Sequence, residues 1–182
     1  PENTKTLRYA VRSQGDKGFL FMINFQDDVE IADINDVSVE VETGNETIRF
    51  PSSGTFDLKK STSAIFPFNL KLGQTLIKSA TVQPLTSLRS DQGNCYVFFS
   101  IDGIAPELAI DGKPDLKQLQ NTKSSQKNNF TLVLGKNYEV LSFKNGSDQF
   151  LIIPHEMALN SSKIGKHLII SDGLILNDDD QM

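Results

Sequence analysis

Apolar and polar residues alternate along several short stretches of this chain, which is the pattern of β-strands that bury one face. Val37–Thr43 carries valine at alternate positions, and Phe66–Leu72 carries phenylalanine or leucine at alternate positions. Because Pro67 lies within the second stretch and has no N–H to donate to a neighbouring strand, we expect that strand at the edge of a sheet.

Three other runs are apolar at nearly every position, namely Phe19–Phe25, Tyr96–Ile101 and Phe150–Ile153. A run without polar alternation is typical of a central strand that other elements cover on both faces. We therefore expect these three runs in the middle of their sheets, with both faces buried.

Pairs of turn-forming residues separate many of the expected strands. Gly44-Asn45, Asn145-Gly146 and Asp172-Gly173 each lie between two strand-like runs. Such pairs relieve the steric cost of the positive φ that tight hairpins require. The third pair predicts a hairpin between 168–170 and 174–176.

Helical signals are few. Pro154–Asn160 is long enough for about two turns, with proline at the start, where its missing N–H does no harm. Pro114–Asn121 is a second candidate. Because no alternation of strand and helix occurs, the pattern excludes Rossmann and (β/α)₈-barrel folds. We predict an all-β protein, an antiparallel β-sandwich of jelly-roll-like or Greek-key type with one or two short helices.

The 182 residues fit a single domain, residues 1–182, which is the division that we favour. An alternative interpretation starts from the polar stretch at 112–128, which has the composition of a surface loop. In that interpretation residues 1–111 form a β-sandwich and residues 129–182 a small β unit.

Charge and composition exclude several kinds of partner. The net charge is −5, whereas nucleic-acid and anionic membrane surfaces need clustered lysine and arginine, so we expect neither partner. No apolar run reaches the ~20 residues of a membrane span, and the start of the chain shows no signal segment. The single cysteine, Cys95, allows no intrachain disulfide and no thiolate metal cage.

No motif predicts catalysis. His155-Glu156 is similar to the start of a zinc-protease helix, but Leu159 stands where the second histidine is required, so we interpret His155 as a surface residue near a helix start. With His167 as the only other histidine, a catalytic triad is not expected. Cys95 lies in an apolar stretch and is interpreted as a small buried hydrophobe. We expect no catalytic, cofactor-binding or metal-ligating residue, and no cofactor.

Acidic residues gather in two places. Asp27–Asp36 contains five carboxylates, a composition that suits calcium, but the spacing is not that of an EF-hand and no glycine provides its turn. We interpret this segment as a solvated acidic loop. Asp178–Asp180 is interpreted in the same way, as a solvated tail.

Carbohydrate sites usually stack sugar rings on exposed aromatic side chains beside a few polar groups. The chain has no tryptophan and three tyrosines, at positions 9, 96 and 138. Its twelve phenylalanines fall mostly at strand positions that face a core. An independent sugar site is therefore a weaker hypothesis than a structural role.

Several stretches together carry a further signal. Leu7–Arg12 precedes Gly18–Phe25, which begins Gly-Phe-Leu-Phe; Thr47–Pro51 ends in Phe-Pro, and Ile65–Leu70 contains Pro-Phe-Asn-Leu. This succession resembles the segment that follows the catalytic barrel in β-galactosidases of glycoside hydrolase family 35. Three later stretches are also similar to that region: Val97–Gly103, Pro106–Ile110 and Leu151–Ala158.

In that family the segment is a non-catalytic β-domain beside a (β/α)₈ barrel. The resemblance therefore implies an accessory domain of a larger β-galactosidase-like enzyme, with the barrel of the same parent chain as its partner and a periplasmic or extracellular location. The family's catalytic glutamates belong to the barrel, and no position here matches them. The tryptophans of many relatives are also absent.

Our leading hypothesis is a structural or interaction module, which predicts an exposed apolar patch where the barrel docks. The alternative is an independent carbohydrate-binding module, which requires a concave face with an exposed tyrosine or phenylalanine. A third hypothesis is an enzyme in its own right, which requires two close carboxylates in a cleft or a metal at Asp27–Asp36.

Overall fold

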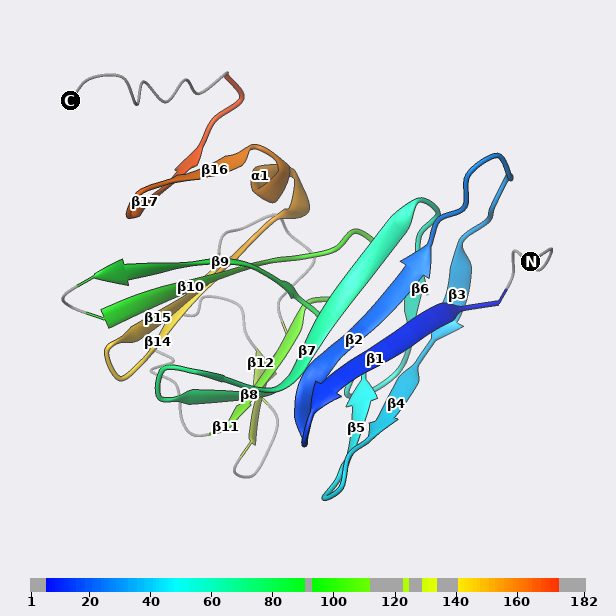
Figure 1. Cartoon of the computed structure of the whole chain (residues 1–182), viewed down its shortest axis with the longest axis horizontal. Coiled ribbons are helices and arrows are strands. Elements are labelled where there is room, and N and C mark those ends of the chain that lie inside the picture. The colour runs from blue at the N-terminus through cyan, green and yellow to red at the C-terminus, as the bar shows by residue number, and fades with distance from the viewer. Residues whose placement is uncertain (1–5, 91–92, 112–122, 125–128, 134–140, 174–182) are drawn as a thin grey trace.

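In the part of the chain that the structure describes, the fold is built almost entirely of β-sheets and includes one short helix (Figure 1). The structure is a computed structural model that describes residues 6–90, 93–111, 123–124, 129–133 and 141–173. The prediction of an all-β, sandwich-like fold is confirmed. The predicted helix at 114–121 and the second strand of the predicted 168–176 hairpin lie outside the described residues, as does the tail at 178–180.

The largest element is a seven-stranded sheet, called the large sheet below. Every neighbouring pair in it is antiparallel. Its strands, in spatial order, are β1 (Arg8–Gln14), β2 (Lys17–Asn24), β7 (Thr62–Leu72), β8 (Thr75–Ala80), β11 (Glu107–Asp111), β13 (Asn129–Val133) and β12 (Lys123–Ser124).

A second sheet has four strands, in the order β14 (Leu141–Asn145), β15 (Asp148–Ile153), β10 (Gly93–Phe99) and β9 (Gln83–Ser90). The predicted central position of Tyr96–Ile101 and Phe150–Ile153 is confirmed, since β10 and β15 are its two inner strands. Their predicted burial on both faces is incomplete, because Tyr96, Phe99 and Leu151 are half-buried. They pair in parallel, which hairpin signals do not predict. A parallel pair needs a long connection, and here strands of the large sheet lie between β10 and β15 in the chain.

Three small antiparallel pairs complete the described strands: β3 (Ile34–Val37) with β6 (Phe56–Leu58), β4 (Val39–Glu42) with β5 (Thr47–Phe50), and β16 (Ser161–Ile164) with β17 (His167–Ile170). The predicted strand at Val37–Thr43 is therefore two strands, β3 and β4. The residue before Val37, Asp36, has a positive φ of 57°. The predicted hairpin turns at Gly44-Asn45 and Asn145-Gly146 are confirmed.

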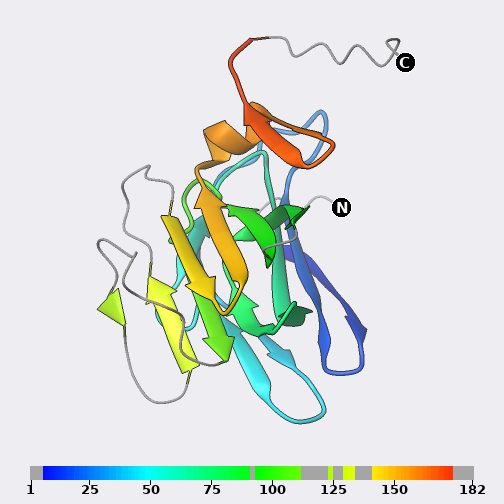
Figure 2. The same ribbon diagram turned by 90° about the vertical axis from the view of Figure 1, so that its left-hand side faces the viewer.

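The predicted helix after Pro154 is also confirmed, as α1 (His155–Leu159). It leads into the β16–β17 hairpin, drawn in orange and red at the top of Figure 2. Lys163 Nζ donates a hydrogen bond to the Ser87 carbonyl of β9 over 2.9 Å. This contact ties the hairpin to the second sheet.

The prediction that Pro67 marks an edge strand is wrong, because β7 lies between β2 and β8. Pairing with β8 begins only at Phe68, so no strand accepts an N–H on that side of Pro67. Two residues earlier, the Ile65 N–H donates to Gln83 Oε1 over 2.9 Å, in place of a strand partner. Proline is thus tolerated in an inner strand, since its missing N–H falls where the ladder is interrupted.

Two hydrophobic cores form on the large sheet. Core 1 lies between β2, the first half of β7 and the small pairs β3–β6 and β4–β5; it includes Leu20, Met22, Val41, Phe50, Phe56, Phe66 and Phe68. Core 2 lies between β8, β11 and the second sheet; it includes Ile77, Leu108, Ile110, Phe98, Phe143, Phe150 and Ile152.

The burial of β7 changes from core 1 to core 2 at Asn69, which has a positive φ of 48°. Phe66 and Phe68 belong to core 1, whereas Leu70 and Leu72 pack against core 2. The neighbouring β8 shows the same change: Ser79 pairs with Phe68, and Ile77, a member of core 2, pairs with Leu70. Lys78, the neighbour of Ile77 in β8, donates a hydrogen bond to Glu46 in the turn of the β4–β5 pair, which covers core 1. Because successive side chains of a strand point to opposite faces, Ile77 and core 2 lie on the face of the large sheet opposite core 1.

Candidate functional site

One face of the large sheet, across β1, β2 and the first half of β7, carries apolar side chains that are only partly covered. The registers align Arg8 with Ile23 and Ser63, Ala10 with Phe21 and Ile65, and Arg12 with Phe19 and Pro67. Paired residues of an antiparallel sheet point to the same side. We call these nine residues the open face: Arg8, Ala10, Arg12, Phe19, Phe21, Ile23, Ser63, Ile65 and Pro67.

The open face lies opposite core 1, because it alternates along β2 and β7 with the buried residues Leu20, Met22, Ala64 and Phe66. It is therefore on the same side of the sheet as core 2. The second sheet covers that side over β8 and β11, and β9 reaches β7 at Ile65. Pro67 of β7 is buried. Towards β1 the cover ends, so Phe19, Phe21 and Ile65 are half-buried and Ala10, Arg12 and Ile23 are exposed.

The sequence interpretation of Phe19–Phe25 as a run buried on both faces is wrong for this reason. Leu20, Met22 and Asn24 are buried, but Ile23 is 42% exposed and Phe25 is 48% exposed. The apolar residues on the exposed side of β2 are the signal that could have indicated a second contact surface. It was available in the sequence, but it cannot distinguish a face covered within the fold from a face awaiting a partner.

A hollow of about 340 Å³ opens on this face, lined by residues of β1, β2 and β7. Its walls are the open-face side chains of Arg8, Ala10, Phe21, Ile23, Ser63 and Ile65. Tyr9, Met22 and Ala64 also line it, and since their side chains alternate towards core 1, they contribute backbone to its floor. The volume lies within the roughly 300–1,000 Å³ of small ligand sites.

The polar groups of the open face are two arginines and a serine. The guanidinium of Arg8 is held at one end of the hollow, where Nη1 donates to the Phe25 carbonyl over 3.5 Å and Nη2 donates to Gln26 Oε1. Arg12 is exposed and makes no hydrogen bond or ion pair within the described part of the chain. The open face is thus basic in a chain whose net charge is −5, and it contains no carboxylate, histidine or cysteine.

Further exposed apolar side chains surround the open face. Tyr9 is 60% exposed, and Val11, Phe25 and Val29 are each more than 40% exposed. Tyr9 pairs with Met22 and Val11 pairs with Leu20, so their side chains point to the core-1 side of the outermost strand rather than into the hollow. The apolar surface therefore continues around the β1 edge.

The other candidate residues from the sequence lie elsewhere. His155 stacks on Phe99 with ring centroids 5.9 Å apart, and its Nδ1 lies 3.4 Å from Asp102 Oδ2. Cys95 is half-buried, and burial raises the pKa of its thiol. Tyr96 packs on Phe150 beside core 2, and burial raises the pKa of its hydroxyl. Tyr138 lies outside the described residues.

Within the acidic segment Asp27–Asp36, one carboxylate already has a cationic partner. Asp33 Oδ2 accepts a hydrogen bond from Lys59 Nζ over 2.9 Å, and Oδ1 accepts one from the Lys60 N–H over 2.9 Å. These hydrogen bonds hold the pKa of Asp33 below its usual value. Among the residues that the structure describes, no three His, Cys, Asp or Glu side chains are grouped closely enough to hold a metal ion.

Comparison with known proteins assigns the chain to no family. No protein-family model matches the chain, and no curated protein matches it. Across the described ranges, no helix is both long and apolar enough to cross a membrane.

Proposed function

We propose that this chain is a non-catalytic accessory domain that packs through its open face against a catalytic domain. The observation that carries the proposal is the partly covered apolar group of Phe19, Phe21, Ile23 and Ile65, of which Ile23 is 42% exposed and the others are half-buried. It lies on the same side of the sheet that the second sheet covers further along. Exposed contiguous apolar surface of this kind marks protein contact sites. The family resemblance in the sequence supplies the partner, the (β/α)₈ barrel of a β-galactosidase-like glycoside hydrolase.

Energetics favour a partner over this face. Full burial of an exposed isoleucine or phenylalanine contributes roughly 1.5–3 kcal/mol relative to exposure. Ile23 on the open face is 42% exposed, and Phe25 beside that face is 48% exposed, so a partner that covers them gains part of this free energy. Arg8 and Arg12 supply a charged rim around the apolar centre, which is the usual arrangement of a specific interface. Because the open face contains no carboxylate, the proposal assigns it binding and leaves bond cleavage to the partner.

The first test is the coding DNA upstream of the codon for Pro1. The proposal expects the same reading frame to encode a (β/α)₈ barrel with paired glutamates. An upstream frame that encodes no barrel overturns the identity of the partner.

The second test is direct binding of the separately produced barrel, measured by calorimetry. Ile23→Glu places a carboxylate on the middle strand of the open face, at its most exposed large apolar residue, and we expect it to weaken binding more than tenfold. The control is Leu159→Glu, which changes another strongly exposed apolar residue, 73% exposed on α1, and should bind like the wild type. Equal affinities for the two variants would exclude the open face as the contact.

A carbohydrate-binding module is the second candidate, because the hollow is concave and Phe21 lines it beside Arg8 and Ser63. A ring face and a few converging polar groups are the minimum for a sugar site. Calorimetry with galactose and a galactose disaccharide tests this candidate. Saturable heat that Phe21→Ala abolishes would support it, and absence of heat at millimolar sugar would remove it.

A further inference from the structure

We propose that the hollow on the open face receives a single aromatic anchor side chain of the partner, and that a carboxylate next to the anchor pairs with Arg12. This inference rests on the proposed function and adds the chemistry of the contact. It predicts that the partner surface presents a protruding ring beside an acidic residue.

The hollow, at about 340 Å³, has room for an aromatic side chain, since a cavity of roughly 150 Å³ already holds a benzene ring. Its walls come from three adjacent strands, with Ala10 opposite Phe21 and Phe21 opposite Ile65 in the registers. Ala10 has the smallest side chain of the open face, so it leaves space beside the larger side chains of Arg8 and Phe21, which also line the hollow. Fully desolvated pockets that hold one aromatic side chain are the places where interface energy concentrates.

The walls of the hollow are suited to a ring. Phe21 already forms a tilted pair with Phe19, with centroids 6.4 Å apart, and its half-buried ring is available for an offset or edge contact with another ring. Ile23 and Ile65 supply branched aliphatic surface on the other strands. A ring in the hollow would therefore meet apolar atoms on β2 and β7.

The positive charge of Arg12 indicates that the partner group beside the anchor is negatively charged. Arg12 does not line the hollow, but it follows Ala10, which does, by two residues on the same face. The two residues are about 7 Å apart along the strand, a distance that an arginine side chain is long enough to span. Its guanidinium has no partner among the described residues, whereas Arg8 is engaged by Phe25 and Gln26. In a chain of net charge −5, an uncompensated arginine beside an apolar hollow favours an anionic neighbour.

The test uses 3-phenylpropionate as the probe, with 3-phenylpropanol as its neutral counterpart, in an NMR titration of the full chain. We expect the methyl signals of Ile23 and Ile65 to shift with both probes, and the neutral probe to bind about threefold more weakly, as an exposed ion pair allows. Arg12→Gln should remove the difference between the probes. Arg89→Gln, which removes an exposed arginine of β9, is the matched control and should keep it.

Ala10→Phe, which fills the hollow from within, should abolish the shifts while the spectrum remains that of a folded protein. Shifts centred on other residues, equal affinity for both probes, or unchanged binding by a folded Ala10→Phe variant would each overturn the inference. Because the probes are tested without the barrel, failure of the anchor can be distinguished from failure of the proposed function. A chain that binds the probe in the hollow but not the barrel contradicts the proposed function alone, whereas a chain that binds the barrel without probe selectivity contradicts the anchor.

Discussion

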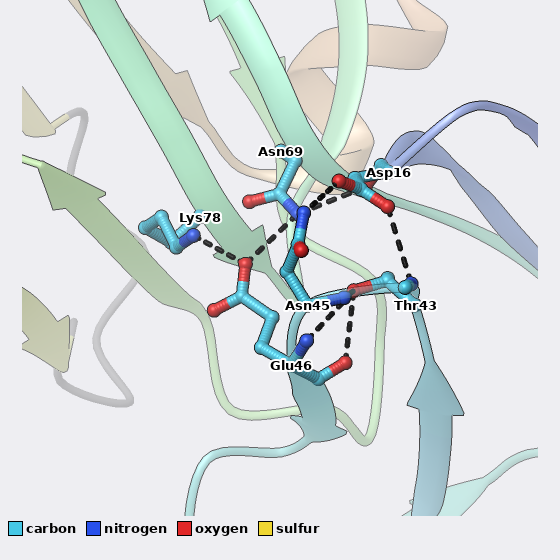
Figure 3. A network of polar contacts seen from close by, with 7 residues as sticks. Asp16, Thr43, Asn45, Glu46, Asn69 and Lys78 are labelled. Atoms are coloured by element: carbon cyan, nitrogen blue, oxygen red, sulfur yellow. Dashed lines mark hydrogen bonds and ion pairs between the residues drawn. The ribbon is translucent and has the colours of Figure 1, made fainter.

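Asn69 in β7 donates a hydrogen bond from Nδ2 to Glu46 Oε1 over 3.0 Å, joining the point where the large sheet changes its buried face to the β4–β5 turn (Figure 3). The same Nδ2 donates to the Asp16 carbonyl over 2.8 Å, and Lys78 Nζ donates to the same Glu46 oxygen. Asp16 Oδ1 in turn accepts the Gly44 N–H over 3.2 Å. The network therefore holds β7, β8, the β1–β2 turn and the β4–β5 turn together.

The first prediction concerns Glu46 and pH. The hydrogen bond from Lys78, and then that from Asn69, hold the pKa of the Glu46 carboxyl below its ordinary value of 4.5. A carboxyl whose pKa is lowered in the folded state stabilises the fold above the unfolded-state pKa, and this contribution is lost as the pH falls through the folded-state pKa. The stability advantage of the wild type over Glu46→Gln should therefore be constant between about pH 7 and 6, and it should shrink as the pH falls below the unfolded-state pKa and through the lower folded-state pKa.

Urea unfolding across this pH range measures the difference. Glu40→Gln is the control, because Glu40 lies in the neighbouring β4 and its ion pair with Arg49 is long, at 3.9 Å, and exposed. An advantage over Glu46→Gln that grows towards acid pH would contradict the network.

The second prediction concerns the backbone of Asn69. Its φ of 48° lies in the left-handed region, which asparagine tolerates and alanine does not. Asn69→Ala and Asn69→Gly both lose the two side-chain hydrogen bonds, but only alanine also keeps a Cβ in that conformation. Asn69→Gly should therefore be the more stable variant by about 1 kcal/mol in urea unfolding. Equal stability would mean that the change of buried face does not depend on this residue's conformation.

Pro67 and Ile23 show why the sequence patterns predicted the strands but not which elements pair with each strand or cover it. Alternation and turn pairs predicted most strands, because side-chain period and positive φ are local properties. Pro67 misled the prediction because only the tertiary structure interrupts the β7–β8 ladder beside it. The prediction for Ile23 was wrong because an apolar residue looks the same in the sequence whether its side chain is covered by another part of the chain or by a partner. The open face follows from the registers, which the sequence does not specify.

The third prediction compares a phenylalanine that other parts of the chain cover with a phenylalanine on the open face. Phe150 is fully buried in core 2 and stacks on Phe143 with ring centroids 4.7 Å apart, whereas Phe21 is half-buried on the open face. Phe150→Ala should lower the free energy of unfolding by about 3–5 kcal/mol, since it leaves a cavity. Phe21→Ala should cost about 1 kcal/mol. A cost for Phe21→Ala as large as that for Phe150→Ala would show that the open face is covered in solution.

The fourth prediction concerns Asp148, a buried carboxylate that joins three strand ends. It is 2% exposed. Its Oδ2 accepts the Gln74 N–H over 3.1 Å, and its Oδ1 accepts the Asn94 N–H over 3.3 Å and Asn94 Nδ2 over 3.0 Å. These bonds connect the β7–β8 turn of the large sheet to β10 and β15 of the second sheet, so the carboxylate links the two layers.

Asp148→Ala leaves these part-buried donors without their acceptor and should cost about 2 kcal/mol in urea unfolding. Asp148→Asn keeps one acceptor oxygen and should recover about half of that loss. Gly73→Ala tests the same contact from the other side, because a Cβ at Gly73, whose φ is 56°, would lie 1.9 Å from Asp148 Oδ2. In the Asp148→Ala background the added methyl meets no carboxylate, so Gly73→Ala should cost less there than in the wild type. Equal losses of stability in the two backgrounds would mean that Gly73→Ala destabilises the fold only through the backbone conformation of Gly73 and not through a clash with the Asp148 carboxylate.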